Sequence, residues 1–328
     1  MVIAFRCLST EIASDGGCCA PACEPGLNGG EAVGEHKFAP RSSAGRLAPQ
    51  LDERIIRWLL AAVPVIAAVR LIGGWTFLGC PASLATSRPP PTYPPMQLKV
   101  ASYNIRKAVG LDWRRKPGRV LEVLNEIGAD VVALQEVDRR FGSRISALDP
   151  ELIDRETDYQ AIRFSHRPQS LGYHGNVILA RKAIRVADAR PMVLPHLEPR
   201  GAAVADLEFN GRRLRVVGMH LGLTRKWRQL QTETIVAELR ALEGNMPAVL
   251  MGDLNEPDLK SGVLRAFEQR HTIAACGPSF HASMPVFTLD RIIVTEDIAI
   301  GDCGVHRSAL SRDASDHLPI WAKLTLPT

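Results

Sequence analysis

The chain has 328 residues, of which 46% are apolar and 23% are charged, and its mean hydropathy is close to zero. This balance excludes a disordered chain and a polytopic membrane protein, and the length suffices for one large core or two ordinary ones. The formal net charge of +5 is too small and too diffuse to identify a nucleic-acid partner.

The first 95 residues differ in composition from the rest of the chain. Residues 1–50 are rich in Gly, Pro, Ala and Cys, show neither a strand nor a helix period, and are expected to be disordered. Five of the seven cysteines precede residue 96, namely Cys7, Cys18, Cys19, Cys23 and Cys80. Because no second spaced pair follows the cysteines at 18–23, we do not expect a zinc site there.

Residues 1–95 leave three interpretations open: an extension without function, a membrane anchor at 58–80, and a partner-binding tail. The two apolar runs on either side of Arg70 are each too short to span a bilayer, and joining them places an arginine in the membrane at a cost of about 2.5–3.5 kcal/mol. A proline-rich linker at 89–95 and then Met96 follow, so translation could instead start at Met96. We expect a cytoplasmic protein if translation starts at Met96, and a membrane-anchored one if residues 58–80 insert.

Residues 96–328 alternate between strand and helix patterns. Apolar runs predict buried strands at 98–102, 131–134, 177–180, 248–251, 290–294 and 318–324. Helical spacing predicts helices at 120–127, 226–242 and 259–268. Strands at 204–209 and 214–219 are joined through Asn210-Gly211, a strong hairpin signal. These elements predict one domain in which two mixed sheets pack face to face under helices.

Several of the predicted strands end in polar residues that can carry chemistry. These residues are Asn104, Glu136, His220, Asp253, Asn255, Asp290, Asp316 and His317. Each has an ordinary structural explanation, such as a turn former, a solvated strand end, a core histidine or a helix cap. Because strands of a layered domain end at common edges, however, the whole set can converge on one cleft. The oxygen donors in it suit Mg²⁺ or Mn²⁺ better than zinc.

The order and spacing of these motifs resemble a known family. The matching segments are Asn104, Gln135-Glu136, His220, Gly252-Asp253-Leu254-Asn255, Asp290 and Ser315-Asp316-His317. They are similar to those of the endonuclease/exonuclease/phosphatase family, which includes deoxyribonuclease I, apurinic endonucleases, sphingomyelinases and inositol polyphosphate 5-phosphatases. The resemblance covers residues 96–328. It implies an α+β fold, a four-layered αββα sandwich, and divalent-metal-dependent cleavage of phosphoester bonds.

The resemblance also implies roles for the metal ligands. Glu136 matches the glutamate that binds the ion in the family, and a carboxylate at a strand end is rigidly placed. Asn104 and Asp316 are expected to complete or support this Mg²⁺ or Mn²⁺ site and to leave positions open for phosphate.

The remaining residues are expected to act on the phosphorus centre during in-line attack of water. Asp253 is the expected activator of the water, and Asn255 can donate an amide proton to a phosphoryl oxygen. His317 is expected to stabilise charge, with Asp290 as its orienting partner. His220 could protonate the leaving oxygen or only donate a hydrogen bond to it.

Two basic clusters that each carry a tryptophan follow catalytic strand ends. Their candidate substrate-binding residues are Arg114, Arg115, Arg225 and Arg228. Basic and aromatic side chains together are typical of nucleic-acid grooves, but both clusters also open helices and could form solvated faces. A nuclease or general phosphodiesterase ranks slightly ahead of an inositol-phosphate, sugar-phosphate or phospholipid hydrolase. A non-catalytic binding module on the same fold is the remaining alternative, and no protein partner is inferred.

Overall fold

The computed structural model describes residues 95–139, 142–165, 167–242 and 246–327. The predictions of a membrane anchor at 58–80 and of disorder in residues 1–50 lie outside these residues. In the part of the chain that the structure describes, no helix is long and apolar enough to cross a membrane.

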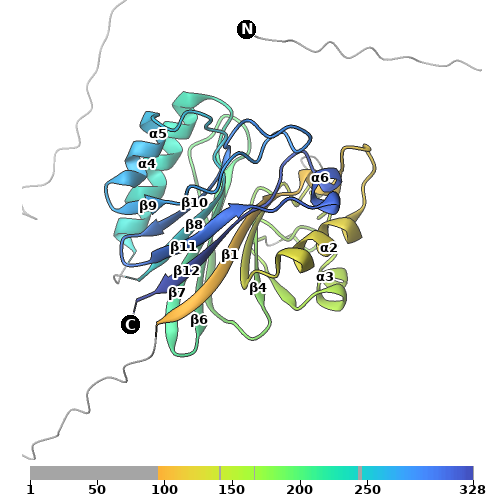
Figure 1. Cartoon of the computed structure of the whole chain (residues 1–328), viewed down its shortest axis with the longest axis horizontal. Helices are drawn as coiled ribbons and strands as arrows, with labels where there is room; N and C mark the ends of the chain where they lie inside the picture. The colour runs from red at the N-terminus through yellow and green to blue at the C-terminus, as the bar shows by residue number, and fades with distance from the viewer. Residues whose placement is uncertain (1–94, 140–141, 166, 243–245, 328) are drawn as a thin grey trace, which may run out of the picture. The chain divides into compact units, whose positions relative to one another are not determined.

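Two six-stranded mixed sheets form the centre of the structure (Figure 1). The first sheet has the order β11 (Ala299–Val305), β12 (Ile320–Leu326), β1 (Met96–Asn104), β2 (Val131–Gln135), β4 (Val177–Arg181), β3 (Tyr159–Ile162). The second has the order β5 (Arg185–Met192), β6 (Gly201–Phe209), β7 (Arg212–His220), β8 (Ala248–Asp253), β10 (Asp290–Thr295), β9 (His271–Ile273). Each contains one parallel pair, β1 with β2 and β7 with β8. All eight predicted strands are present.

Helices cover the outer face of each sheet. The helices α2 (Pro117–Ile127), α3 (Pro150–Glu156) and α6 (Ala309–Ala314) contribute to an apolar cluster with the outer side chains of β1, β2 and β4. The helices α4 (Arg225–Ala241) and α5 (Gly262–Glu268) do the same for the second sheet. A third cluster lies between the two sheets. The predicted αββα sandwich of the α+β class is therefore confirmed.

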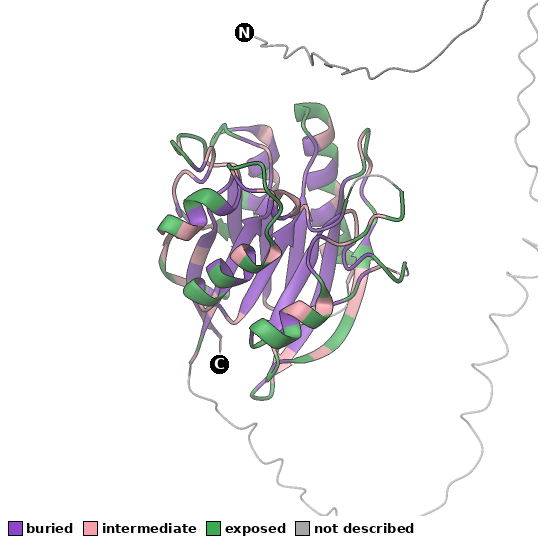
Figure 2. Ribbon diagram, turned by 90° about the vertical axis from the view of Figure 1, so that its right-hand side faces the viewer, coloured by how far each residue is buried: buried purple, intermediate pink, exposed green. Residues whose placement is uncertain are grey.

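Successive side chains of an inner strand point to opposite faces of the sheet and therefore belong to different apolar clusters. In β1, Leu98 and Val100 belong to the cluster between the sheets, whereas Ala101 and Tyr103 face the helices. Both faces of the strand are apolar because both are covered. Figure 2 shows the result as purple strands beneath helices whose outer surfaces are green.

The predicted hairpin at Asn210-Gly211 sets the register of β6 and β7. Both turn residues have positive φ, 50° and 75°, as a two-residue type I′ turn requires. The pairing runs without interruption from Phe209–Arg212 at the turn to Gly201–His220 at the opposite end. The turn therefore determines where His220 lies along the sheet, at the end of β7 opposite the turn.

The close approach of β7 and β8 requires a glycine at position 252. A Cβ added to Gly252 would lie 1.8 Å from the carbonyl oxygen of Met219. We expect Gly252→Ala to lower the free energy of unfolding by about 1–3 kcal/mol or more, because backbone must move to relieve the overlap. The measurement is urea unfolding. The matched control is Gly118→Ala in α2, where an added Cβ meets nothing within 4 Å and is expected to be neutral or stabilising. Equal midpoints for the two variants would contradict the prediction.

Candidate active site

The register of the second sheet brings three predicted site residues to one edge. The parallel pairing of β7 and β8 places His220 opposite Asp253, and the antiparallel pairing of β8 and β10 places Asp290 opposite Asp253. All three side chains are buried. The sheet hydrogen bonds therefore hold a histidine and two carboxylates side by side, although 70 positions separate the first from the last in sequence.

The first sheet brings the other residues to the same edge. Asn104 at the end of β1 pairs with Gln135 at the end of β2. Glu136 is the first residue after β2. The hydroxyl of Ser315 donates to the carbonyl oxygen of Asn104 (2.7 Å), which holds the segment 315–317 beside both strand ends. The carboxyl ends of the two parallel strands and the entry to β12 thus form one half of the site.

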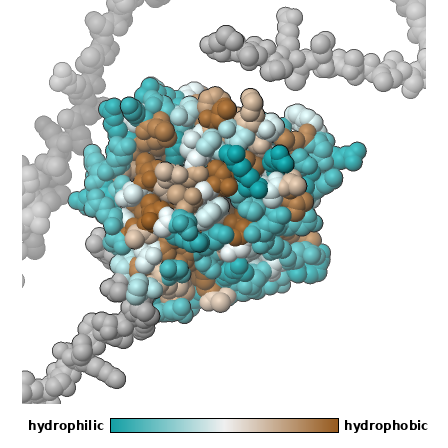
Figure 3. Space-filling model, in the orientation of Figure 1, coloured by the Kyte–Doolittle hydropathy of each residue, from teal (hydrophilic) through white to brown (hydrophobic). Residues whose placement is uncertain are grey.

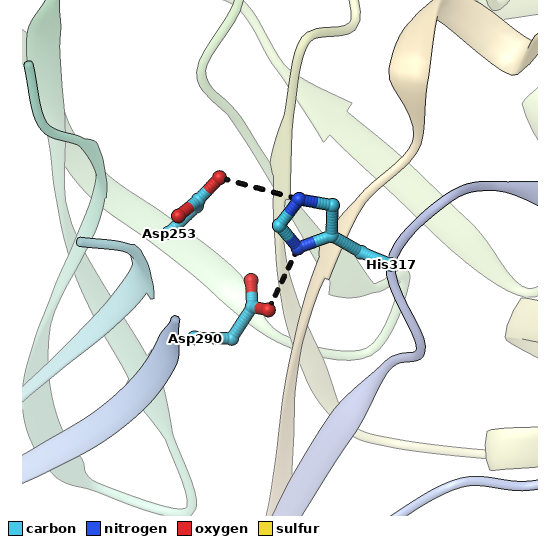
Figure 4. Close-up of side chains that lie close together, drawn as sticks. All are labelled: Asp253, Asp290 and His317. Carbon is cyan, nitrogen blue, oxygen red and sulfur yellow. Dashed lines mark hydrogen bonds and ion pairs between the residues drawn. The ribbon is translucent and has the colours of Figure 1, made fainter. Parts of the chain in front are cut away.

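Asp253 lies where the two halves meet. Asn104 donates from Nδ2 to Oδ2 of Asp253 (3.0 Å), and the Nε2 atoms of His220 and His317 lie 3.4 and 3.6 Å from the same oxygen. The backbone N–H of Asn255 donates to the other carboxylate oxygen (2.9 Å). Figure 4 shows Asp253 facing one ring nitrogen of His317. Asp253 therefore contacts predicted site residues of both sheets, Asn104 in the first and His220 in the second.

His317 lies between two carboxylates. Its Nδ1 is 2.9 Å from Oδ2 of Asp290, which also accepts a hydrogen bond from the hydroxyl of Ser279 (2.5 Å) (Figure 4). Burial by itself would lower the pKa of His317, but the negative charges of Asp290 and Asp253 outweigh burial and raise that pKa to about 10. His317 is therefore an imidazolium at neutral pH, with Asp290 as the partner that orients it.

Arg200 contacts both ring nitrogens of His220. Its Nη1 atom lies 2.8 Å from Nδ1 and 2.7 Å from Nε2. Since a guanidinium has only N–H donors, a ring nitrogen that accepts from it carries no proton. The choice between the two roles of His220, proton delivery or hydrogen-bond donation, stays a prediction.

The three predicted metal ligands lie around the end of β1. Glu136 forms an ion pair with Lys107, and Asp316 forms one with Arg106 (Nε to Oδ2, 3.4 Å). The Oδ1 atom of Asn104 accepts the backbone N–H of Arg106 (3.1 Å). Both carboxylates are partly exposed, so ions in solution can reach them.

This donor set fits a divalent ion. Glu136 and Asp316 offer hard carboxylate oxygens that already stabilise positive charge, and Asn104 offers an amide oxygen. The ligand atoms of Asp253, Asp290 and His317 also lie within 4.8 Å of one another. This second group therefore also offers ligand atoms that could hold an ion, and its members form the ion pairs described above.

Asn255 has a positive φ of 52°, and its side-chain amide donates to the carbonyl oxygen of Leu221 (2.9 Å). This bond fixes the amide next to Asp253 at the end of β7. One N–H of the amide remains for the predicted contact with a phosphoryl oxygen.

Three of the four predicted substrate-binding arginines are exposed. Arg114 and Arg115 lie in the loop between β1 and α2, and Arg225 begins α4 after the end of β7. Arg115 donates from Nε to the carbonyl oxygen of Lys107 (3.1 Å), which ties this loop to the site. The substrate-binding role of these three exposed arginines stays a prediction.

Arg228 does not fit the prediction. Its guanidinium is buried, 3.2 Å from the carboxylate of Glu256, and donates to the carbonyl oxygen of Leu223 (2.6 Å). The reason is helical geometry, because position 228 lies on the face of α4 that packs against the loop after β8. Arg228 therefore holds two loops of the site together, in place of the expected substrate contact.

Apolar side chains surround the site on the surface. We call the end of the two sheets where Asn104, Glu136, His220 and Asp253 lie the catalytic edge. In the described residues, all eight large apolar side chains that are at least half exposed lie in loops at this end of the sheets. They are Trp113, Val193, Leu197, Leu223, Leu259, Met284, Val286 and Phe287. Figure 3 shows brown areas between teal ones in the upper half of the view. A concentration of exposed apolar side chains at one end of a molecule is typical of a contact surface.

Sequence reasoning missed Arg106, Lys107, Ser279 and Arg200. The first two lie in η1 (Arg106–Ala108), whose three residues all have positive φ, and this turn brings them to the metal-ligand carboxylates. Their position two and three residues after Asn104 was the available signal. Ser279 and Arg200 reach the site only through tertiary contacts, so no local pattern could reveal them.

Comparisons with known proteins agree with this geometry. A family model described as "Endonuclease/Exonuclease/phosphatase family" matches residues 101–317. The uncharacterized protein YbhP of Escherichia coli (strain K12) is 25% identical over 248 residues, which are 70% of this chain and 96% of that protein.

Two solved structures share the fold. The structure of D. rerio TDP2 complexed with a single-strand DNA product has a TM-score of 0.55 at 19% identity, and the match covers 70% of this chain and 98% of that one. The mannosyl-6-phosphatase of Bacteroides thetaiotaomicron VPI-5482 has a TM-score of 0.55 at 17% identity, with coverage of 69% and 99%.

Proposed function

Because the chain belongs to the endonuclease/exonuclease/phosphatase family, we propose that it is a divalent-metal-dependent hydrolase that cleaves phosphodiesters by in-line attack of water. The observation that carries this proposal is the position of Asp253. One of its carboxylate oxygens faces Asn104, His220 and His317, so a single buried carboxylate connects both halves of the site.

Asp253 is suited to orient and deprotonate water. Neighbouring donors hold its side chain in place, and Nε2 of His317 lies 3.6 Å from its Oδ2 atom. Water bound to this carboxylate would be directed at the phosphorus atom from the side of β8.

The positive and polar groups around Asp253 stabilise the charge that develops on the phosphoryl oxygens. His317 contributes a full positive charge that is fixed in place by Asp290. Asn255 and His220 contribute N–H groups from the ends of the neighbouring strands. Preorganised donors of this kind account for much of the rate acceleration in hydrolases.

A divalent ion held by Glu136, Asn104 and Asp316 would supply Lewis-acid stabilisation of a phosphoryl oxygen. The side chains of Lys107 and Arg106, which now pair with these carboxylates, would then be released toward the substrate. Both are close enough to the ligands to contact a phosphate bound there.

The surface around the site supports a substrate with large organic groups. Exposed apolar side chains and basic residues such as Arg114 and Arg225 alternate in the loops of the catalytic edge. A nucleic acid offers both charged phosphates and flat bases to such a surface, and DNA is the product bound in the TDP2 structure. Inositol-phosphate, sugar-phosphate or phospholipid substrates are the alternative, and a mannosyl-6-phosphatase is among the structures that share the fold.

The test of this proposal is hydrolysis of bis(p-nitrophenyl) phosphate with and without a chelator, followed by a panel of DNA, RNA, phosphoinositides and sphingomyelin. We expect turnover with Mg²⁺ or Mn²⁺ and none with excess EDTA. Turnover that persists in EDTA would contradict the metal requirement. An absence of turnover with every divalent ion and substrate would favour a binding module.

Glu136 provides the sharper test of the metal site. We expect Glu136→Gln to raise the Mg²⁺ concentration required for half-maximal turnover by about 10–100-fold, because the amide lacks the charge that binds the ion. The matched control is Glu151→Gln in α3, which changes an exposed residue at the N-terminus of that helix. If the two variants require the same Mg²⁺ concentration, Glu136 is not the principal ligand.

A further inference from the structure

A cavity of about 230 Å³ adjoins the active site. Two of its lining residues touch predicted site residues. A Cβ added to Gly175 would lie 3.4 Å from the Cα of Glu136, and Arg200 contacts the ring of His220. The cavity is therefore close enough to the scissile phosphate to hold another part of the same substrate.

The cavity is lined by three guanidinium groups, those of Arg139, Arg144 and Arg200, and by His174. Arg144 donates from Nη1 to Nδ1 of His174 (3.2 Å), and no described carboxylate forms an ion pair with Arg144. An imidazole that accepts this bond must be neutral at that nitrogen. In agreement, burial and the charge of Arg144 lower the pKa of His174 to about 4. A neutral ring thus orients Arg144 without cancelling its charge.

The two acidic residues of the cavity are already occupied by donors. Asp138 accepts the hydroxyl of Ser170 (2.8 Å) and the backbone N–H groups of Leu171 (3.2 Å) and Gly172 (3.0 Å). Glu198 accepts the backbone N–H of Leu223 (2.7 Å) and forms an ion pair with Arg200 (Oε1 to Nε, 3.8 Å). These carboxylates organise the loops around the cavity, while the guanidinium of Arg144 remains available for an anion.

We propose that this cavity binds a second phosphate group of the substrate, next to the phosphate that is cleaved. The inference rests on the proposed phosphoester hydrolysis and narrows it to substrates with at least two phosphates. A guanidinium fork matches phosphate oxygens in a bidentate manner, and Leu223 and Pro199 offer an apolar wall for the organic group between the two phosphates. That second phosphate could belong to a nucleic-acid strand or to a small bisphosphorylated molecule.

The test is equilibrium binding by calorimetry, with Ca²⁺ in place of Mg²⁺, so that the readout does not depend on turnover. One arm compares thymidine 3′,5′-bisphosphate with thymidine 5′-monophosphate, and the other compares inositol 1,4-bisphosphate with inositol 1-phosphate. For the wild-type chain we expect the second phosphate to tighten binding by about tenfold in at least one arm. The arm in which this occurs identifies the source of the second phosphate.

The variant Arg144→Gln is expected to abolish this tenfold preference and to leave binding of the monophosphate unchanged. Arg144→Lys keeps the charge but not the fork, and we expect it to retain part of the preference. The matched control is Arg155→Gln in α3, an exposed arginine whose recorded partner is the neighbouring Glu156.

The proposal is wrong if neither bisphosphate binds more tightly than its monophosphate, or if Arg144→Gln keeps the full preference while its melting temperature matches that of the wild type. These outcomes are distinct from failure of the proposed function. A chain that hydrolyses phosphodiesters but shows no preference lacks the second phosphate site, and one that shows the preference but hydrolyses nothing is a binding module.

Discussion

Asp253→Asn is expected to lower kcat/KM for bis(p-nitrophenyl) phosphate by about 10³-fold, within the usual range for loss of a general base. The substitution keeps the size of the side chain but removes the charge that accepts the proton of water. It also leaves the imidazolium of His317 without one of the two carboxylates that flank it. The loss should therefore appear chiefly in kcat, because the remaining donors still bind the phosphate.

Two measurements make this test of Asp253 decisive. Circular dichroism and thermal unfolding must show that the variant is folded, since a buried carboxylate with several donors also contributes to stability. The matched control is Asp258→Asn, an exposed residue of the following loop whose side chain accepts the backbone N–H of Lys260 (2.9 Å). If folded Asp253→Asn turns over substrate within tenfold of the wild type and of this control, the assignment of Asp253 is wrong.

His317→Gln is expected to lower turnover by about 10²–10³-fold, because it removes a fixed positive charge from the site of developing negative charge. The same variant should change how stability depends on pH. The pKa of His317 is raised from 6.5 to about 10 in the folded protein, so folding takes up a proton between these values. The stabilisation is complete below about pH 6.5 and is lost as the pH rises through about 10.

The measurement is the free energy of unfolding of metal-free protein in EDTA, from denaturant titrations between about pH 6 and 10. We expect the wild-type value to fall with rising pH over this window and the His317→Gln value to change much less. The matched control is His306→Gln, which changes a half-buried histidine that pairs with Glu126 (2.9 Å). A variant with the same pH slope as the wild type would show that His317 is not held as an imidazolium.

The strands that the sequence predicted and those it did not differ in position within the sheets. All eight predicted strands are inner strands, whereas the four that were missed, β3, β5, β9 and β11, are the four sheet edges. An inner strand is covered on both faces and reads as a continuous apolar run. Edge strands are partly solvated, as the exposed positions along β5 and β11 show, so their sequences lack that run.

In the candidate site too, some features are visible in the sequence and others depend on the fold. Residues such as Asp253 and His220 end apolar strands, and that abrupt change from apolar to polar is visible in the sequence. The contrast between Arg225 and Arg228 is not visible there. Both belong to one basic cluster, but the turn of the helix exposes the first and buries the second against Glu256, 28 positions away.

The sequence by itself determined the αββα architecture, the inner strands and the polar residues that line the catalytic edge, because burial of a strand and chemistry at its end are both local properties. Only the tertiary structure decided that Asp253 joins the two halves, that Lys107 and Arg106 pair with the metal-ligand carboxylates, and that Arg144 and His174 line a cavity beside them. The physical reason is that hydrogen bonds, ion pairs and cavities arise between segments that only folding brings together.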